Sequence, residues 1–282
     1  MANKNLKAPV NIPVEKIHPF EGHPYKVLDN DEMNNLIESI QQKGVISPIV
    51  VRPLEDTTDE YEIISGHRRL RASVKAGLET VPAFIYAINR DEAAIMLVDS
   101  NLHREHILPS EKAFAYKLKL EAMKHQGITC GQVGHKSRDE ISDTDSGRQI
   151  QRYIRLTYLI PELLDLVDEE KIALTPAVEL SYLNEVEQAD LVEEIRVCDA
   201  TPNLSQAQRL RAISRGEGLT PEDIGEILAE EKANQRPTVK FSVERLQKVA
   251  PKVKESDLEN FVMKACEHYY RYLQRQRNRD AR

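Results

Sequence analysis

The sequence contains no tryptophan, five phenylalanines and three cysteines among its 282 residues. Cys130, Cys198 and Cys266 are odd in number and far apart, so neither a disulfide framework nor a metal-ligand spacing is visible. No apolar run approaches the roughly 20 residues that a membrane span requires. The N-terminus, Met1 to Asn5, lacks an apolar signal core. These absences predict a protein of the reducing cytoplasm with inert thiols and no membrane partner.

Charge is distributed unevenly along the chain, whose net charge is −7. The net charges of successive segments are −4 for residues 1–109, +3 for 110–160, −12 for 161–235 and +6 for 236–282. The overall net charge argues against a wholly basic protein that coats nucleic acid. A chain of this kind that binds a polyanion must present its basic segments and turn the acidic one away.

The length suggests two or three domains, and the apolar share of 40% is enough to bury a core. Short strands and helices alternate over the first hundred residues, after an extended entry at 10–20. Strands are predicted at 49–52, 61–64 and 81–86, and helices at 30–43 (capped by Asp29 or Asn30), 67–76 and 91–99.

From Pro109 onward the pattern is helical, with Ser110 as the predicted cap of the first long helix. Helices are predicted at 111–126, 138–142, 146–159, 161–170, 176–183, 187–198, 205–215, 221–231 and 256–277, with a linker at 232–240. The expected fold class is α+β. A small mixed α/β domain at 1–108 precedes an all-α domain at 109–235, and 236–282 form a linker and a short C-terminal helical segment.

A candidate anion site lies where the strand 61–64 runs through Ser65 and Gly66 into a helix. The start of a helix presents unpaired N–H groups and a partial positive charge, and Gly66 lets the backbone approach a ligand closely. Arg68 and Arg69 add forked donors suited to phosphate oxygens. The alternative is a solvated arginine face with Ser65 as a simple cap.

A second polar cluster follows at residues 99–105. Asn101 can donate to and accept from a base or a phosphate, and Arg104 can bind a phosphate. The alternative for this cluster is an ordinary helix end.

Together these segments resemble the conserved boxes of the ParB partition-protein family. The matching stretches are Gly-Val-Ile-Ser-Pro-Ile-Val-Val-Arg at 44–52, Gly-His-Arg-Arg-Leu-Arg-Ala at 66–72, Ser-Asn-Leu-His-Arg-Glu at 100–105 and Leu-Pro-Ser-Glu-Lys-Ala at 108–113. The resemblance covers about residues 10–235. It implies an N-terminal domain that binds CTP and closes a clamp around DNA. The nucleotide-binding residues that it implies are Gly66, Arg68, Arg69, Asn101 and Arg104, and His67, which lies between Gly66 and Arg68, is predicted to belong to the same site.

Three positions depart from the family pattern. His67 and Ser100 stand where family members usually have glutamates, and Ser47 stands where they often have glutamine. Magnesium prefers hard oxygen ligands, and hydrolysis of a triphosphate needs a positioned metal and water. The missing carboxylates therefore argue against a magnesium site and against CTP hydrolysis, and no catalytic or metal-binding residue is predicted.

The segment 146–159 is predicted to be a DNA-recognition helix capped by Ser146. Its apolar face comprises Ile150, Tyr153, Ile154, Thr157 and Tyr158. The predicted DNA-binding residues are Ser146, Arg148, Gln149, Gln151, Arg152 and Arg155. Arginine and glutamine read guanine and adenine edges in the major groove, and no acidic residue interrupts 146–160.

The preceding helix of a helix-turn-helix is assigned to 138–142. A helix-turn-helix after the boxes is also what the resemblance implies, although the stretch from Ile141 to Ile150 is short and 143–145 lack a turn glycine. The alternative is a surface helix paired with the acidic segment 161–235, whose helices are predicted to pack rather than to form a site.

The C-terminal segment pairs an apolar stripe with a basic end. The stripe comprises Leu258, Phe261, Val262, Ala265, Tyr269, Tyr272 and Leu273, and the basic end Arg271, Arg275, Arg277, Arg279 and Arg282. Self-association through the stripe, non-specific binding of DNA phosphates and a frayed tail all remain open.

The sequence thus predicts a cytoplasmic, nucleoid- or plasmid-associated partition protein. It would read an inverted repeat in double-stranded DNA as a homodimer, and the family resemblance implies CTP as its nucleotide and a ParA-type ATPase as its partner. One alternative is a transcription or replication regulator that uses the same reader without nucleotide gating. The less favoured alternative is a nucleotide-dependent enzyme.

Overall fold

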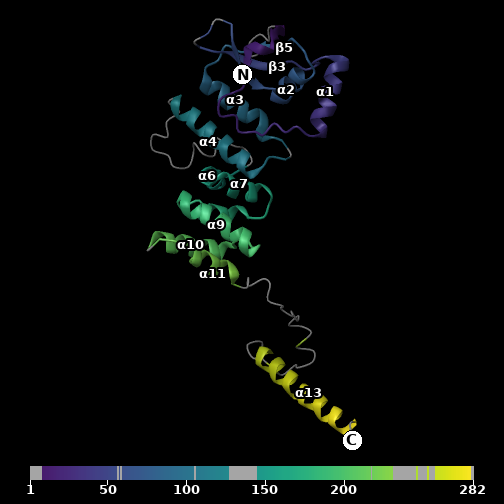
Figure 1. The fold of residues 1–282 in the computed structure, drawn as a ribbon, viewed down its shortest axis with the longest axis vertical. Helices are drawn as coiled ribbons and strands as arrows, with labels where there is room; N and C mark the ends of the chain where they lie inside the picture. Colours follow the sequence, from purple (N-terminus) through teal and green to yellow (C-terminus); the bar gives the residue numbers. More distant parts are fainter. Residues whose placement is uncertain are drawn as a thin grey trace. The chain divides into compact units, whose positions relative to one another are not determined.

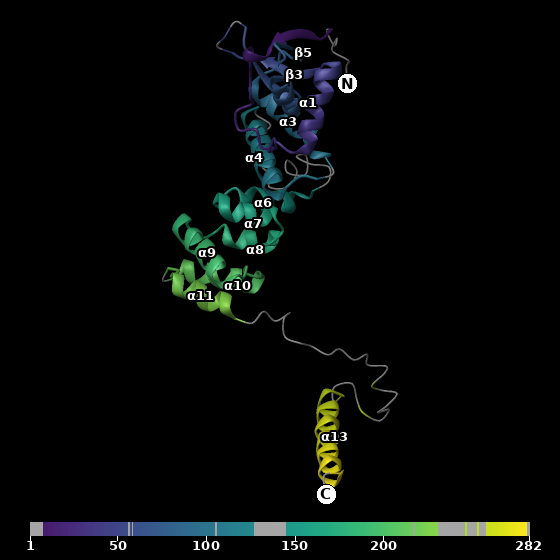
Figure 2. The same cartoon turned by 45° about the vertical axis from the view of Figure 1, so that its right-hand side comes forward.

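The computed structural model describes residues 8–55, 57, 59–104, 106–126, 145–216, 218–230, 246, 253 and 258–280. The chain divides into two compact units, Met1–Glu230 and Glu231–Arg282. The first unit contains a sheet covered by helices and, after it in the chain, a stack of further helices (Figures 1 and 2).

The sheet has five strands in the order β1-β5-β3-β4-β2. They are β1 (Val10–Pro13), β2 (Ile17–His18), β3 (Ile49–Pro53), β4 (Tyr61–Ser65) and β5 (Thr80–Ile85). The central strand β3 pairs antiparallel with β4 and parallel with β5. Ile49, Val51 and Ile63 are buried between this sheet and its helices. The mixed α/β lobe predicted for the first hundred residues is therefore confirmed.

Three helices complete this lobe: α1 (Asp31–Lys43), α2 (His67–Lys75) and α3 (Arg90–Leu102). A short 3₁₀ turn, η1 (Val14–Lys16), separates β1 from β2. Asn30 rather than Asp29 caps α1, since its side chain accepts a hydrogen bond from the Met33 amide at 3.1 Å. Most of the elements predicted here end within a residue or two of the observed bounds.

The long helix α4 (Pro109–His125) packs against α3 on one side and against the later helices on the other. Ser110 is not its cap. The helix begins at Pro109 after Leu108, and Ser110 in the first turn donates from its amide (2.9 Å) and its hydroxyl (2.6 Å) to Asp168. Proline is favoured at the first helical position because it has no N–H to leave unpaired.

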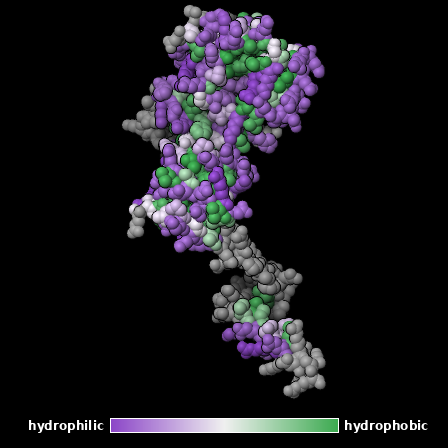
Figure 3. All heavy atoms as spheres, in the orientation of Figure 1, coloured by the Kyte–Doolittle hydropathy of each residue, from purple (hydrophilic) through white to green (hydrophobic). Residues whose placement is uncertain are grey.

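The remaining described part of the first unit is helical. Its helices are α6 (Gly147–Leu156), α7 (Pro161–Asp168), α8 (Leu174–Leu180), α9 (Glu185–Cys198), α10 (Leu204–Arg215) and α11 (Pro221–Ala229). Their apolar faces meet in one core that includes Leu156, Leu163, Leu180, Leu191 and Leu210, all fully buried. Hydrophilic side chains cover most of the face of this unit seen in Figure 3, and hydrophobic ones gather in patches between them.

The second unit is described mainly by α13 (Leu258–Asp280), a single helix of 23 residues. Phe261, Tyr269 and Tyr272 of the predicted stripe are exposed on it. The predicted helix at 138–142 and the linker at 232–240 lie outside the described residues. Where the structure describes the chain, it contains no helix long and apolar enough to cross a membrane.

Candidate functional site

A cavity of about 260 Å³ lies in the sheet-containing lobe. Its walls come from the loop between β2 and α1, the turn from β4 into α2, and the end of α3. The lining residues are His23, Tyr25, Lys26, Val27, Leu36, Ser65, Gly66, His67, Arg68, Arg69, Asn101 and Arg104. All six residues predicted to bind a nucleotide thus line one cavity.

Gly66 shapes the floor of this cavity. Its φ of 102° lies in the left-handed region, and a Cβ at this position would come within 2.8 Å of Ile49 Cγ2. The backbone therefore turns here as only glycine allows, and α2 begins directly after it.

The three arginines of the cavity are held in different ways. Arg69 donates from one terminal nitrogen to the carbonyls of Ser47 (2.5 Å) and Pro48 (2.7 Å), so it fixes the loop before β3. Arg68 pairs with the exposed Glu32 of α1 at 2.9 Å. Arg104 is exposed, and its guanidinium lies 5.6 Å from the ring centroid of Tyr25.

Asn101 is buried beside these charges. Its amide nitrogen donates to the Leu97 carbonyl at 2.7 Å and lies 3.2 Å from the Ser100 hydroxyl. The side-chain amide nitrogen of Asn101 therefore already donates to an acceptor within α3.

Among the lining residues that the sequence did not predict to bind a nucleotide, three polar ones come from a single loop. His23, Tyr25 and Lys26 come from the segment 19–30, here called the strap, which lies about 40 residues before the Gly66 turn. A short polar loop with one histidine, one tyrosine and one lysine carries no spacing signal. Only the packing of the strap against α2 could have revealed them.

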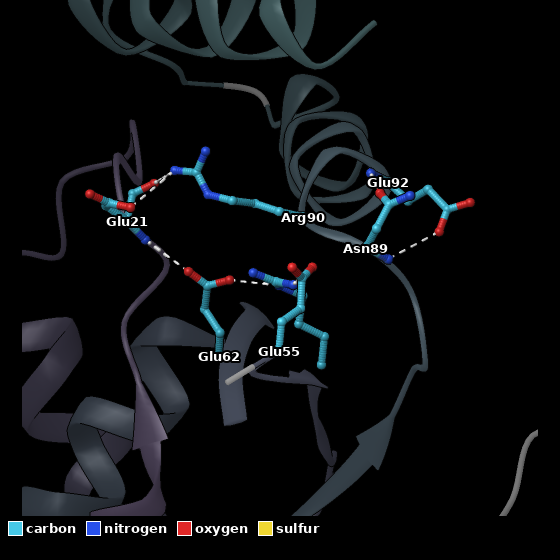
Figure 4. A network of polar contacts seen from close by, with 7 residues as sticks. Glu21, Glu55, Glu62, Asn89, Arg90 and Glu92 are labelled. Carbon is cyan, nitrogen blue, oxygen red and sulfur yellow. Dashed lines mark hydrogen bonds and ion pairs between the residues drawn. The ribbon is translucent and has the colours of Figure 1, made fainter. Parts of the chain in front are cut away.

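The strap is anchored at both ends. At its start, the Glu21 amide donates to Glu62 at 3.1 Å, and Glu62 forms a buried ion pair with Arg52 Nε at 2.7 Å (Figure 4). Arg90 also reaches the Glu21 side chain at 3.3 Å. At its end, Asp29 accepts two hydrogen bonds from Arg71 of α2, which hold the pKa of that carboxyl well below its usual range.

Lys26 connects the cavity to the helical stack. Its amide donates to Glu111 of α4 at 2.8 Å. Its Nζ lies 3.3 Å from Asp168 and 3.4 Å from Asp165, both on α7. Asp168 in turn holds Ser110, so one carboxylate joins the strap to the start of α4.

The cavity lining contains no carboxylate. Arg69 and Arg104, which have no ion pair among the described residues, supply positive charge, and the N-terminus of α2 adds a partial one. Lys26 and Arg68 also line the cavity, but their charges are shared with Asp165, Asp168 and Glu32. The cavity is therefore suited to an anion with several charges. Among the described residues, no cluster of three or more His, Cys, Asp or Glu could hold a metal ion.

The predicted recognition helix is α6. Ser146 caps it by accepting from the Gln149 amide at 3.3 Å. Ile150 is fully buried against Tyr116 and Met123 of α4, which fixes the rotation of the helix. Ile150, which belongs to the predicted apolar face of this helix, is thus buried as expected.

The polar side of α6 remains accessible. Arg148 is exposed, and Gln149, Gln151 and Arg152 are partly exposed. Within the part of the chain that the structure describes, neither Arg148 nor Arg152 has an ion pair or a side-chain hydrogen bond. These two guanidinium groups are therefore not neutralised by the described acidic helices.

Arg155 is different, because its side chain is bound within the fold. It donates to the Ser181 hydroxyl at 3.0 Å and to the Ser181 carbonyl at 2.7 Å. Its guanidinium also lies between the rings of Tyr158 (4.3 Å) and Tyr182 (4.0 Å). Tyr158 was expected on the apolar face, but it is 58% exposed because it packs against Arg155 instead of entering the core.

The start of α6 is fixed to α4 through Asp145. This carboxylate accepts from the Tyr116 hydroxyl at 2.5 Å and pairs with Lys112 at 3.2 Å. Lys112 also lies 5.2 Å from the ring of Tyr153. The helix with the accessible arginines is therefore attached to α4 at its start and through Tyr153.

The sequence matches the model of the ParB N-terminal domain over residues 2–102. A nucleoid occlusion protein of Listeria innocua is 31% identical over 189 residues, which cover 67% of this chain and 66% of that protein. The chromosome-partitioning protein Spo0J of Thermus thermophilus is 31% identical over 202 residues, which cover 72% of this chain and 70% of that protein.

Among solved structures, the C-terminally truncated partition protein ParB of Caulobacter crescentus in complex with its centromeric parS site is 21% identical. The match covers 72% of this chain and 98% of that one, with a TM-score of 0.42. Further nucleoid occlusion proteins of Listeria monocytogenes match over 45% and 46% of their length. The chain thus spans about half to two thirds of the relatives it matches.

Proposed function

This chain belongs to the ParB family, and we propose that it is a sequence-specific DNA-binding partition protein whose sheet-containing lobe binds CTP. The observation that carries the proposal is the polar side of α6, where Arg148 and Arg152 have no ion pair among the described residues, on a helix whose other side is buried. Its Listeria and Thermus relatives are named for nucleoid occlusion and chromosome partitioning. Those names support an action on the segregation or maintenance of a chromosome, plasmid or mobile element.

In this proposal, Arg148, Gln149, Gln151 and Arg152 read base edges in the major groove, and Ser146 contacts the DNA at the helix start. Arg155 acts instead as a positioning residue, because its donors are bound to Ser181. The protein reads an inverted repeat as a homodimer in the cytoplasm, and a ParA-type ATPase is its partner.

The positioning role of Arg155 predicts a loss of stability. We expect Arg155→Ala to lower the free energy of unfolding by about 1–3 kcal/mol, because two hydrogen bonds and two aromatic contacts disappear. Urea denaturation measures this loss. Binding to specific and scrambled DNA should weaken together, and a selective change of preference at one base pair would instead place Arg155 at a base.

The nucleotide part of the proposal rests on the cavity. Gly66, the start of α2 and the arginines form an anion cradle without a carboxylate. Ligand pockets commonly enclose about 300–1,000 Å³, so this cavity of about 260 Å³ is suited to the phosphate part of CTP. Arg68 and Arg104 would bind the phosphates, His67 and Asn101 would line them, and Arg69 would hold the loop beside them. No magnesium site is proposed.

Removal of the exposed cation should weaken nucleotide binding. We expect Arg104→Gln to reduce CTP affinity by about 10- to 100-fold, the value of one hydrogen bond between charged groups. Calorimetric titration of the full chain measures it, with Arg196→Gln on the exposed side of α9 as the matched control. Equal affinities of the two variants would contradict the assignment.

One experiment separates the partition proposal from its alternatives. Footprinting on DNA with the specific site should show protection that spreads over flanking DNA only when CTP is present. Protection confined to the site with and without nucleotide would identify a regulator without nucleotide gating. Turnover of labelled CTP or ATP would identify an enzyme.

A further inference from the structure

Two histidines face each other inside the cavity. His23 comes from the strap and His67 from the first position of α2, and their ring centroids lie 3.7 Å apart at an interplanar angle of 34°. The Nε2 atom of His67 is buried and has no hydrogen-bond partner within the described residues. A buried ring nitrogen without a partner costs free energy, so a role in binding a ligand is the natural explanation.

The groups that line the cavity around this pair are cationic or neutral, and they include Lys26 of the strap. The nearest carboxylates lie behind the lining, Glu32 paired with Arg68 and Asp165 and Asp168 with Lys26. Arg104 faces it from the end of α3 and Tyr25 from the strap, while Arg68 and Arg69 lie on α2 itself. Burial, with further contributions from His23 and Arg104, lowers the pKa of His67 to about 3. Burial and Arg104 also lower the pKa of His23. Both rings are therefore neutral near pH 7 while the cavity holds no anion.

A bound triphosphate would favour the protonated form of these histidines. The lining offers none of the carboxylate oxygens that usually help to hold magnesium. A unit negative charge at about 4 Å raises the pKa of an imidazole by about three at an intermediate effective dielectric constant. Several phosphate charges close to His67 can thus raise its pKa into the physiological pH range.

Resting on the proposed nucleotide function, we propose that the His23–His67 pair takes up one proton when a nucleoside triphosphate enters the cavity. The imidazolium then supplies the countercharge that a divalent cation would otherwise supply. The proton comes from solvent, and Nε2 of His67 becomes a donor to a phosphate oxygen. No covalent bond is made or broken.

The sign of the pH dependence follows from linkage. Because the pKa of the pair is higher in the complex than in the free protein, affinity rises as the pH falls toward and through the pKa of the complex. For one proton the change reaches about tenfold per pH unit. The affinity should not depend on magnesium.

The test is calorimetric titration of CTP into the full chain in EDTA, at one pH, in buffers that differ in their heat of ionisation. The slope of the observed heat against the buffer's heat of ionisation counts the protons taken up. We expect the unmutated chain to take up about one proton more than His67→Gln. Protonation of CTP itself is common to all variants and cancels in this difference. His268→Gln, at an exposed histidine of α13, is the control and should keep the full proton count.

Each outcome decides the proposal. Equal proton counts for the unmutated chain and His67→Gln would overturn it while leaving the nucleotide function intact. The absence of binding heat with every nucleoside triphosphate would overturn both. If His67→Gln does not fold, the unmutated chain decides: affinity that is equal in EDTA and in magnesium and that rises with acidity supports the proposal, and a requirement for magnesium overturns it.

Discussion

Replacing Glu62 with alanine is expected to lower the free energy of unfolding by about 3–5 kcal/mol, because the buried Arg52 would lose its buried partner and keep only the exposed Glu55 at 3.5 Å. The exposed fraction of the Arg52 side chain is 4% and that of Glu62 is 6%, and their contact of 2.7 Å joins β3 to β4. The loss corresponds to a fall of about 6–20 °C in Tm for a unit of this size. Thermal unfolding followed by circular dichroism measures it.

The chain offers a matched control in Glu55, which also contacts Arg52, at 3.5 Å, but whose side chain is 70% exposed. Glu55→Ala should cost less than about 1 kcal/mol, because an exposed ion pair is screened by solvent. Equal losses of unfolding free energy in Glu62→Ala and Glu55→Ala would show that burial does not set the contribution of the Arg52–Glu62 pair to stability. The double replacement Arg52→Met with Glu62→Met should recover most of the stability, since no charge is then left buried.

A different substitution of Glu62 tests its link to the cavity. Glu62 accepts the Glu21 amide at 3.1 Å and so fixes the start of the strap. A Glu62→Gln variant retains an acceptor oxygen for this amide. It should therefore lose less free energy of CTP binding than free energy of unfolding.

The second large effect concerns DNA. Replacing Arg148 and Arg152 together with alanine is expected to cost about 2–6 kcal/mol of specific binding if each makes a bidentate base contact worth about 1–3 kcal/mol. Neither side chain supports the fold through a hydrogen bond or ion pair among the described residues, so stability should change little. Fluorescence anisotropy with specific and scrambled duplexes, at fixed salt, measures the loss.

The controls for this experiment lie elsewhere in the same unit, Arg196 on α9 and Lys171 in the connection between α7 and α8. Lys171→Ala with Arg196→Ala removes the same charge from exposed positions outside α6 and should preserve discrimination between the two duplexes. The salt dependence provides a second check, because loss of phosphate contacts alone flattens it without changing sequence preference. Unchanged discrimination in the Arg148/Arg152 variant would refute α6 as the reader.

Periodicity placed most of the helices and strands, since each was marked by a local pattern. Residue type alone identified Ser146 as a cap and left Asp29 or Asn30 for the first helix, where the structure shows Asn30, because a short polar side chain at a helix start satisfies nearby amides. The same reasoning wrongly predicted Ser110 as a cap. A proline at the preceding position had already begun the helix, and the partner of Ser110 proved to be Asp168, 58 residues away.

What the sequence by itself determined was the character of the two sites: a glycine turn with arginines before a helix, and an arginine-rich helix with one apolar side. Those features depend on residues within a few turns of one another, where spacing alone sets geometry. Only the tertiary structure decided which side chains are available. Arg155 is bound to Ser181 and Arg69 to the loop before β3, whereas His23 and Lys26 reach the cavity from a distant strap. Such contacts join segments far apart in the chain, and the spacing of neighbouring residues does not determine which distant segments pack together.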